Sequence, residues 1–262
     1  MLAPRAKKSY GQHFLKNENI AARIAGFAGD ISDQVLVLEV GPGKGILTQF
    51  LKEKHPHFYC VELDPEMIEY LSDRWPDLMP RIIRSDFLRV DITTLALGKE
   101  VLLIGNFPYN ISSQIVFHAI QHRQSVLRVI GMFQKEMADR IIAPPGGKSY
   151  GVISVLTQAY FTGRKLMDLA PGSFDPPPKV NSTVIELSAR EDGGIDVEYK
   201  AFARVVKCAF SMRRKMLRNN LKSIFDKELM TDTFFDRRPE QLSVSEFVSL
   251  TKYLNDPINY KM

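Results

Sequence analysis

The segment at residues 105–110 reads Gly-Asn-Phe-Pro-Tyr-Asn and carries residue types that could do chemistry together. Pro108 has no backbone N–H and favours an extended Phe107, so this loop is stiff and rich in hydrogen-bond acceptors. The Asn106 oxygen beside a fixed carbonyl could accept both protons of a planar –NH₂ group, and the Tyr109 ring offers a stacking face. These features indicate a site for an exposed nucleobase amine. The alternative is a strand-to-helix turn in which asparagine and proline serve only the backbone.

A glycine-rich turn lies upstream, after an apolar run that ends with Glu39 and Val40. Its first glycines are Gly41 and Gly43, but Ile46 occupies the position where a dinucleotide-binding fingerprint has glycine or alanine. Glu62 follows about twenty residues later, where an acidic side chain accepts hydrogen bonds from ribose hydroxyls. A carboxylate at a helix entry is the alternative for this residue. The pattern indicates a nucleoside ligand without a pyrophosphate.

Strand and helix signals alternate along most of the chain. Apolar runs predict strands at residues 35–40, 58–61, 81–85, 101–104 and 126–133, with helical spacing between them. This alternation predicts an α/β fold with a Rossmann-like parallel sheet that is covered on both faces. Glu62, Asp86 and Asn106 follow successive strands, at the edge where open α/β sheets bind ligands.

Composition limits the class of protein. Of the 262 residues, 45% are hydrophobic and 25% are charged, as in ordinary soluble domains. No apolar run reaches membrane-spanning length, so we expect a cytoplasmic protein without membrane contact. A net charge of +5 suggests a polyanionic partner. His118 and His122 have the spacing of metal ligands on a helix, but Ala119 replaces the usual glutamate, and we expect no metal site.

A polar linker at residues 190–194 divides the chain. We therefore predict a catalytic domain at 1–190, which begins with a basic arm, and a small all-helical domain at 195–262. Within the arm, residues 12–15 are apolar enough to dock on the fold. In the second domain, Arg214 and Arg218 stand one helical turn apart and would repel each other unless an anion such as phosphate lies between them. A solvated basic face is the alternative.

Taken in order, these motifs resemble a class I methyltransferase that uses S-adenosylmethionine and acts on adenine amines. Further segments narrow the resemblance: Gln-His-Phe-Leu at 12–15, Phe-Asp-Pro-Pro-Pro-Lys-Val at 174–180 and Arg-Arg-Lys at 213–215. From about Tyr10 to the C-terminus the chain is similar to the small-subunit (16S) ribosomal RNA adenine dimethyltransferases, the KsgA/RsmA family. The resemblance implies S-adenosyl-L-methionine as cofactor. It implies, as substrate, two adjacent adenines near the 3′ end of 16S rRNA in the immature 30S subunit.

The resemblance also implies roles for individual residues. It places cofactor contacts at His13, Leu15, Glu39, Gly41, Gly43, Glu62, Asp86 and Asn106. The target adenine is expected at Asn106, Phe107, Pro108 and Tyr109, with Phe174 as a second stacking face. The expected RNA contacts are Arg213, Arg214, Lys215 and Arg218. Phe107 stands where this family commonly has leucine and would add bulk beside the target base, and His13 stands where many members have asparagine.

The chemistry that the resemblance implies needs neither a metal nor an acid–base dyad, because a sulfonium already makes its methyl group a strong electrophile. Catalysis is then expected to come from positioning, with the Asn106 oxygen and the Phe107 carbonyl accepting the amine protons. Two alternatives stay open. One is a large-subunit rRNA adenine methyltransferase of the antibiotic-resistance type, against which residues 213–219 argue. The other is a ribosome-assembly factor whose catalysis is secondary. We expect a monomer.

Overall fold

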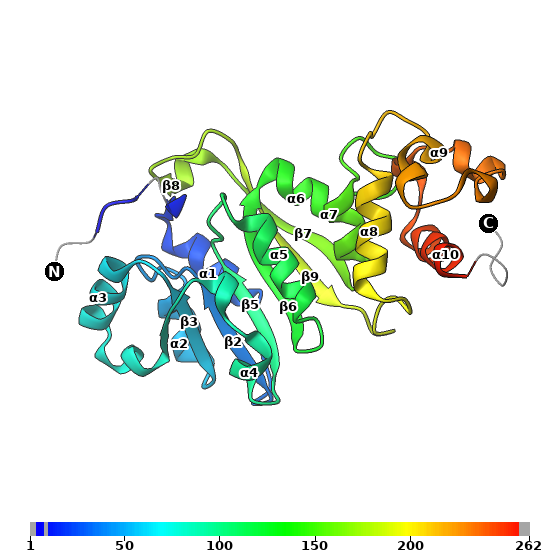
Figure 1. The fold of residues 1–262 in the computed structure, drawn as a ribbon. Helices are drawn as coiled ribbons and strands as arrows, with labels where there is room; N and C mark the ends of the chain where they lie inside the picture. Colours follow the sequence, from blue (N-terminus) through cyan, green and yellow to red (C-terminus); the bar gives the residue numbers. More distant parts are fainter. Residues whose placement is uncertain (1–3, 8–9, 257–262) are drawn as a thin grey trace. The chain divides into compact units, whose positions relative to one another are not determined.

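The computed structural model describes residues 4–7 and 10–256 (Figure 1). Its helices and strands, in chain order, are β1 (Phe14–Leu15), α1 (Glu18–Gly26), β2 (Val35–Val40), α2 (Thr48–Lys54), β3 (Phe58–Glu62), α3 (Pro65–Arg74), β4 (Ile82–Arg84), α4 (Ile92–Ala96), β5 (Glu100–Gly105), α5 (Ser112–Gln121), β6 (Val126–Gln134), α6 (Lys135–Ile141), α7 (Val152–Gln158), β7 (Phe161–Leu169), β8 (Phe174–Asp175), β9 (Ser182–Ala189), α8 (Tyr199–Ala209), α9 (Leu217–Asn220) and α10 (Val244–Asn255). Short 3₁₀ turns lie between several of them.

The chain forms two compact units. The first comprises Met1–Ala138 and Gly163–Ala189, and the second comprises Asp139–Thr162 and Arg190–Met262. The sequence predicted one boundary at 190–195 and placed everything before it in the first domain. The structure instead groups 139–162 with the C-terminal helices, because the apolar side chains of α7 pack against α8. The chain enters the second unit at residue 139 and leaves it at residue 162 without a linker segment whose composition could mark these boundaries in the sequence.

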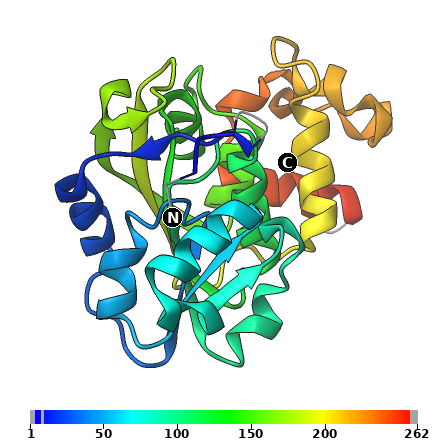
Figure 2. The same ribbon diagram turned by 90° about the vertical axis from the view of Figure 1, so that its left-hand side faces the viewer.

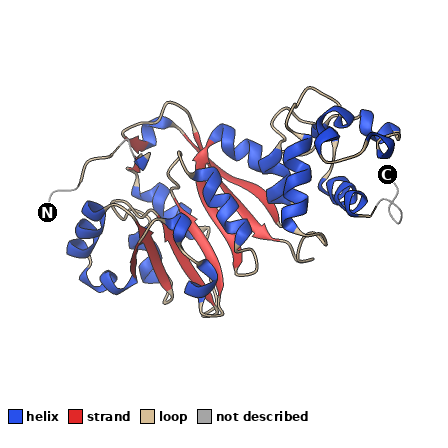
Figure 3. Cartoon of the chain, viewed as in Figure 1, coloured by secondary structure: helices blue, strands red, loops and turns tan. Residues whose placement is uncertain are grey.

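A seven-stranded sheet with the order β4-β3-β2-β5-β6-β9-β7 forms the centre of the first unit (Figure 3). Strands β4, β3, β2, β5 and β6 are joined by parallel pairings, and β9 runs antiparallel to β6. The predicted parallel sheet is confirmed, and its five strands are present. Strands β7 and β9 were not predicted. The middle of β7 is polar and exposed, so its sequence lacks the apolar run by which a buried strand is found.

Helices cover both faces of this sheet, as Figure 2 shows with α1 and α2 in blue on one side and α5 in green on the other. All six residues of β2 are buried, which is typical of a strand covered on both faces. Val37 packs in the cluster that contains Ile24 of α1. Leu38 points to the opposite face, because successive side chains of a strand alternate.

The order of the strands creates a topological switch point between β2 and β5. From β2 the chain proceeds outward through β3 and β4, and it then returns to β5 on the other side of β2. The loops that follow Val40 and Gly105 therefore diverge from neighbouring strand ends. Such a crevice is where open α/β sheets bind ligands.

The N-terminal arm reaches the fold through a separate two-stranded sheet. β1 pairs antiparallel with β8, and Leu15 is the register partner of Phe174. Phe14 and Leu15 are buried. The predicted docking of residues 12–15 is thus confirmed.

The second unit is built from helices around aromatic side chains. Phe202, Val205 and Val206 of α8 are buried and form an apolar stripe along the helix. The rings of Phe210 and Phe247 stack with centroids 5.9 Å apart. Across the described ranges of both units, no helix is long and apolar enough to cross a membrane.

Candidate active site

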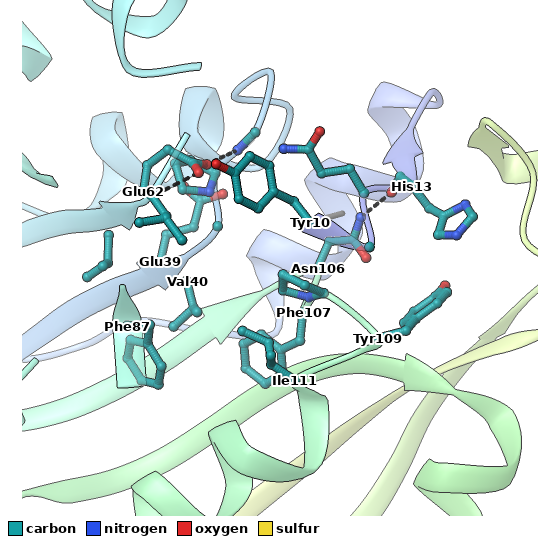
Figure 4. Close-up of a pocket in the computed structure, with 18 of the residues that line it drawn as sticks. Tyr10, His13, Glu39, Val40, Glu62, Phe87, Asn106, Phe107, Tyr109 and Ile111 are labelled. Carbon is teal, nitrogen blue, oxygen red and sulfur yellow. Dashed lines mark hydrogen bonds between the residues drawn. The ribbon is translucent and has the colours of Figure 1, made fainter. Parts of the chain in front are cut away.

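A cavity of about 360 Å³ lies at the switch point of the sheet, within the first unit (Figure 4). The N-terminal arm and the loops after β2, β3, β4 and β5 form its walls. All of the residues predicted to contact the cofactor line this cavity: His13, Leu15, Glu39, Gly41, Gly43, Glu62, Asp86 and Asn106. The loop from Asn106 to Ile111 lines it as well.

The glycine turn after β2 brings backbone close to its neighbours. Gly41 and Gly43 have φ values of +69° and +54°, in the region that favours glycine. A Cβ added at Gly41 would lie 3.8 Å from the Pro108 ring, and one at Gly43 would lie 2.9 Å from the Phe14 ring. The two glycines therefore leave a cradle of bare backbone that side chains would fill.

The Glu62 carboxylate ties this turn to the end of β3. Its Oε2 accepts from the Gly43 N–H at 3.2 Å, and its Oε1 accepts from the N–H groups of Leu63 and Asp64, both at 2.9 Å. Burial raises the pKa of Glu62, and these N–H groups act in the opposite direction. Glu62 thus accepts hydrogen bonds from backbone at the entry to α3, which was the alternative considered from the sequence. The same carboxylate also lines the cavity.

Glu39 supplies a second, more deeply buried carboxyl group. It is 1% exposed, and the Thr48 hydroxyl donates to its Oε2 at 2.7 Å. Burial raises the pKa of Glu39 to about 8, and the nearby Glu62 charge adds to this shift. At neutral pH the carboxyl group is therefore mostly protonated, and a cationic group placed against it would favour the ionised form.

Asp86 follows β4 and caps the short turn at Phe87–Arg89. Its Oδ1 accepts from the Leu88 N–H at 3.0 Å. No residue in the described ranges donates to Oδ2, so this oxygen can accept from an amine in the cavity, where Phe87 supplies an apolar wall.

Asn106 is held by the N-terminal arm. Its Nδ2 donates to the His13 carbonyl at 2.7 Å, which fixes the orientation of the amide (Figure 4). No described residue donates to Asn106 Oδ1 or to the Phe107 carbonyl. The loop therefore has the two open acceptors that the sequence indicated for an –NH₂ group.

The Phe107 ring does not add bulk beside the target base, contrary to the expectation from sequence. Its side chain is 1% exposed and packs edge-on against Phe133, with ring centroids 5.3 Å apart. A Cβ added at Gly131 would lie 2.3 Å from this ring. The missing side chain at Gly131 thus makes room for phenylalanine inside the fold.

The Tyr109 ring is held from two directions. Its hydroxyl lies 2.6 Å from Ser182 Oγ at the start of β9. The His13 ring stacks against it, with centroids 5.3 Å apart and planes 26° apart, and His13 Nδ1 lies 2.7 Å from the Pro176 carbonyl. Burial raises the pKa of Tyr109. Figure 4 shows the His13 ring on the Tyr109 side of the site, so it is the His13 backbone that serves Asn106.

The arm is also fastened to the beginning of α3. Lys7 Nζ lies 2.7 Å from Asp64 Oδ1 and 3.0 Å from Glu66 Oε1, and Gln12 Nε2 donates to Asp64 Oδ2 at 3.4 Å. At Gly11, with φ of +62°, an added Cβ would lie 2.5 Å from the Asn110 side-chain oxygen. The arm thus touches both sides of the cavity.

Phe174 does not offer the second stacking face that was expected. The residue is fully buried in the core cluster with Leu15, its register partner across β1 and β8. A ring without an exposed face cannot stack on a base. Its role in this structure is to anchor the arm.

The basic segment of the second unit contains cations that have a partner within the fold and cations that have none among the described residues. Arg218 forms an ion pair with Asp236 at 2.6 Å, and Arg213 donates to the Gly147 carbonyl at 3.2 Å. The Asp236 carboxylate therefore supplies an anion beside Arg218, so the spacing of Arg214 and Arg218 does not by itself require a phosphate. Arg214 and Lys215 are exposed and make no ion pair within the described ranges.

Two residues at or near the cavity were not predicted from the sequence. Lys44 carries its ammonium 4.6 Å from the Phe14 ring centroid at the cavity wall. Ser182, which fixes Tyr109, lies 73 residues away in sequence. Lys44 could have been noted from its place within the glycine turn. Ser182 had no local signal, because only the pairing of β6 with β9 brings it near.

Comparisons with solved structures show which fold the chain has. The fold resembles a dimethyladenosine transferase from Plasmodium falciparum with a TM-score of 0.79 and 22% identity, covering 95% of this chain and 100% of the other. It resembles the 23S rRNA methyltransferase ErmE with a TM-score of 0.67 and 21% identity, covering 90% and 99%. At these identities the likeness shows a fold, that of Rossmann-like class I methyltransferases.

Comparisons of sequence give the family. Residues 3–256 match the family described as "Ribosomal RNA adenine dimethylase". A "Ribosomal RNA small subunit methyltransferase A" of Flavobacterium johnsoniae is 46% identical over 249 residues, which covers 95% of each chain. One of Porphyromonas gingivalis is 43% identical over 259 residues, covering 97% of this chain and 99% of the other. The chain belongs to the ribosomal RNA adenine dimethylase family, and the predicted resemblance is confirmed.

Proposed function

We propose that this protein dimethylates the N6 amines of two adjacent adenines near the 3′ end of 16S rRNA, with S-adenosyl-L-methionine as methyl donor. The observation that carries the proposal is the pair of open acceptors, Asn106 Oδ1 and the Phe107 carbonyl, on residues that line a nucleoside-sized cavity. The names of the small-subunit relatives, at 43% to 46% identity, support the choice of rRNA.

The cavity fits this cofactor by its donor set and its shape. Glu62 and Asp86 offer carboxylate oxygens for ribose hydroxyls and an adenine amine, and the glycine cradle offers bare backbone for the methionyl part. Glu39 lies below that turn, where its buried carboxyl group suits a cation. When bound, the cofactor supplies a methyl group that is already electrophilic.

The work of the protein is then positioning. The lone pair of an adenine amine is drawn into the ring. By accepting hydrogen bonds from its two N–H groups, Asn106 Oδ1 and the Phe107 carbonyl favour a pyramidal nitrogen whose lone pair points out of the base plane. Tyr109, held by Ser182 and His13, provides the face on which a splayed-out base stacks. Because the Phe107 ring is turned into the core, it does not narrow the space for a once-methylated amine.

The test is methyl transfer to immature small subunits with isotopically labelled cofactor, followed by mapping of the modified nucleotide. We expect dimethyladenosine at two adjacent positions of the small-subunit rRNA. Label in large-subunit rRNA, or product that stops at monomethyladenine, contradicts the proposal. An Asn106→Ala protein that still supports subunit maturation in full would make the assembly role the primary one.

For this function we further propose a cytoplasmic protein that acts on the immature 30S subunit as a monomer. The mild positive charge of +5 is compatible with a polyanionic partner. Light scattering of the free protein and of its complex with the subunit tests the stoichiometry, for which we expect one chain per subunit.

A further inference from the structure

Helix α5 begins at the loop that faces the target base. Its first residue, Ser112, donates from Oγ to the Tyr109 carbonyl at 3.1 Å. Ile111, the residue before the helix, lines the cavity (Figure 4). His118 lies further along the same helix. The helix is therefore fixed to the loop after β5 at its beginning, and it carries a histidine in its second half.

The His118 side chain is buried, with 8% of its surface exposed. Its Nε2 donates to the Val90 carbonyl at 2.9 Å, across 28 residues of sequence. Its ring stands edge-on against the Phe87 ring, with centroids 5.1 Å apart and planes 76° apart. A buried imidazole loses its hydration, so it needs a partner for its N–H group within the fold. Here the partner is a backbone carbonyl beside the cavity wall.

Both partners of His118 belong to the segment that follows β4, and we call residues 86–90 the Asp86 turn. The Val90 N–H donates to the Phe87 carbonyl at 3.1 Å, which closes the turn. Asp86 and Phe87 line the cavity, whereas His118 does not. The internal bond gives the turn its shape, and the bond from His118 fixes where the turn stands relative to α5.

A second histidine of α5 holds the residues just after this turn. His122 Nδ1 lies 3.1 Å from Thr93 Oγ1 and 3.7 Å from Asp91 Oδ1. Its ring also packs edge-on against the His118 ring, with centroids 4.7 Å apart. The two histidines that stand one helical turn apart in the sequence therefore both attach the segment after β4 to α5.

We propose that His118 is a positioning residue for the base of the cofactor. From α5 it holds the Asp86 turn in place, so that the Phe87 ring remains an apolar wall at the base and Asp86 Oδ2 remains directed at the amine. The inference rests on the cofactor proposed above and adds a residue that lies behind the cavity wall. When the turn is not held, only a fraction of the molecules has this wall in place, and the affinity for the cofactor falls by that fraction.

The test compares full-length variants in their binding of two ligands, measured by calorimetry and by displacement of labelled ligand. S-adenosylhomocysteine carries the adenine base, and S-ribosylhomocysteine has the same ribose and amino acid without a base. The variants are His118→Phe, which keeps a ring but has no N–H donor, and His118→Gln, which keeps a donor.

The matched control is His55→Phe. His55 is also a buried histidine of the first unit, with 4% of its surface exposed, and it does not line the cavity. Thermal unfolding shows whether each variant is folded. His118→Met, which also lacks the donor, replaces His118→Phe if that variant does not fold.

We expect His118→Phe to bind S-adenosylhomocysteine at least about fivefold more weakly, while its affinity for S-ribosylhomocysteine changes by less than about twofold. His118→Gln should restore most of the lost affinity, and His55→Phe should match wild type. In methyl transfer, His118→Phe should raise KM for S-adenosylmethionine and leave kcat at saturation near the wild-type value, because the target-base side of the site is unchanged.

Equal affinity of wild type and His118→Phe for S-adenosylhomocysteine overturns the inference. So does an equal loss for the ligand without a base, an equal loss in His55→Phe, or a His118→Gln protein that binds no better than His118→Phe. In these cases the proposed function stands, because wild type still binds S-adenosylhomocysteine and methylates the rRNA. If wild type does not bind S-adenosylhomocysteine, the proposed function fails first.

Discussion

The two sides of the cavity are built by interactions of very different range. On the glycine-turn side, Glu39 meets Thr48 nine residues away, and Glu62 meets Gly43 nineteen residues away. On the other side, Asn106 is held by His13, 93 residues away, and Tyr109 by Ser182, 73 residues away. The cofactor side is thus largely defined by its own loops, whereas the side for the target base takes shape only when remote segments assemble. Substitutions on the two sides should therefore separate cofactor affinity from turnover.

The largest effect is expected at Asn106. In Asn106→Ala the acceptor for the amine proton is lost, and the effect of removing one preorganised hydrogen-bonding group at a reacting centre is about 10²–10³-fold in rate. Single-turnover methyl transfer at saturating cofactor measures it. If the rate falls less than about tenfold while the protein remains folded, positioning by Asn106 is not the source of catalysis.

On the opposite side, Glu62→Ala should weaken cofactor binding by roughly 1.5–3 kcal/mol, the scale of a hydrogen bond to a charged group. It should leave the chemical step at saturating cofactor nearly intact. Calorimetry measures the affinity, and Glu69→Ala, on an exposed position of α3, is the matched control. Wild-type affinity in folded Glu62→Ala protein would remove this residue from the cofactor site.

At Tyr109 the ring and the hydroxyl can be separated. Tyr109→Ala should lower turnover through the loss of stacking, which is worth roughly 1–3 kcal/mol per base. Tyr109→Phe keeps the ring and loses the contact to Ser182, so it should remain largely active, and Ser182→Ala should resemble it. Steady-state rates of rRNA methylation distinguish these variants. A normal rate for Tyr109→Ala would contradict the stacking role of the ring.

The last prediction concerns stability rather than activity, and it tests Glu39. Its folded pKa of about 8 lies above the usual carboxyl value of 4.5, so the folded state binds a proton that the unfolded chain releases in this range. This stabilising contribution is complete below about pH 4.5 and is lost as pH rises toward 8. Glu39→Gln stays neutral and should gain unfolding free energy relative to wild type between pH 5 and pH 8, without cofactor. Denaturant unfolding at several pH values measures the difference in unfolding free energy between Glu39→Gln and wild type. A difference that does not change with pH would contradict the raised pKa of Glu39.

The same difference in range explains what the sequence could predict. The alternation of strands and helices and the cofactor-side residues depend on local patterns. The structure has the predicted elements, and it brings the cofactor-side residues to one cavity. The orientation of the Phe107 ring, the burial of Phe174 and the engagement of Arg218 by Asp236 depend on partners far along the chain or on packing. No spacing within the motifs contains that information.

The packing of Phe107 over Gly131 limits which residues can be substituted at these two positions. The ring fills the volume that any side chain at position 131 would need, and Phe133 closes the remaining space. A change at one of these positions is therefore tolerated only together with a change at the other. Among relatives we expect positions 107 and 131 to covary, with side chains at 131 appearing where 107 is smaller than phenylalanine. An alignment of the family would then carry a coupled pair that joins the loop after β5 to the core of β6.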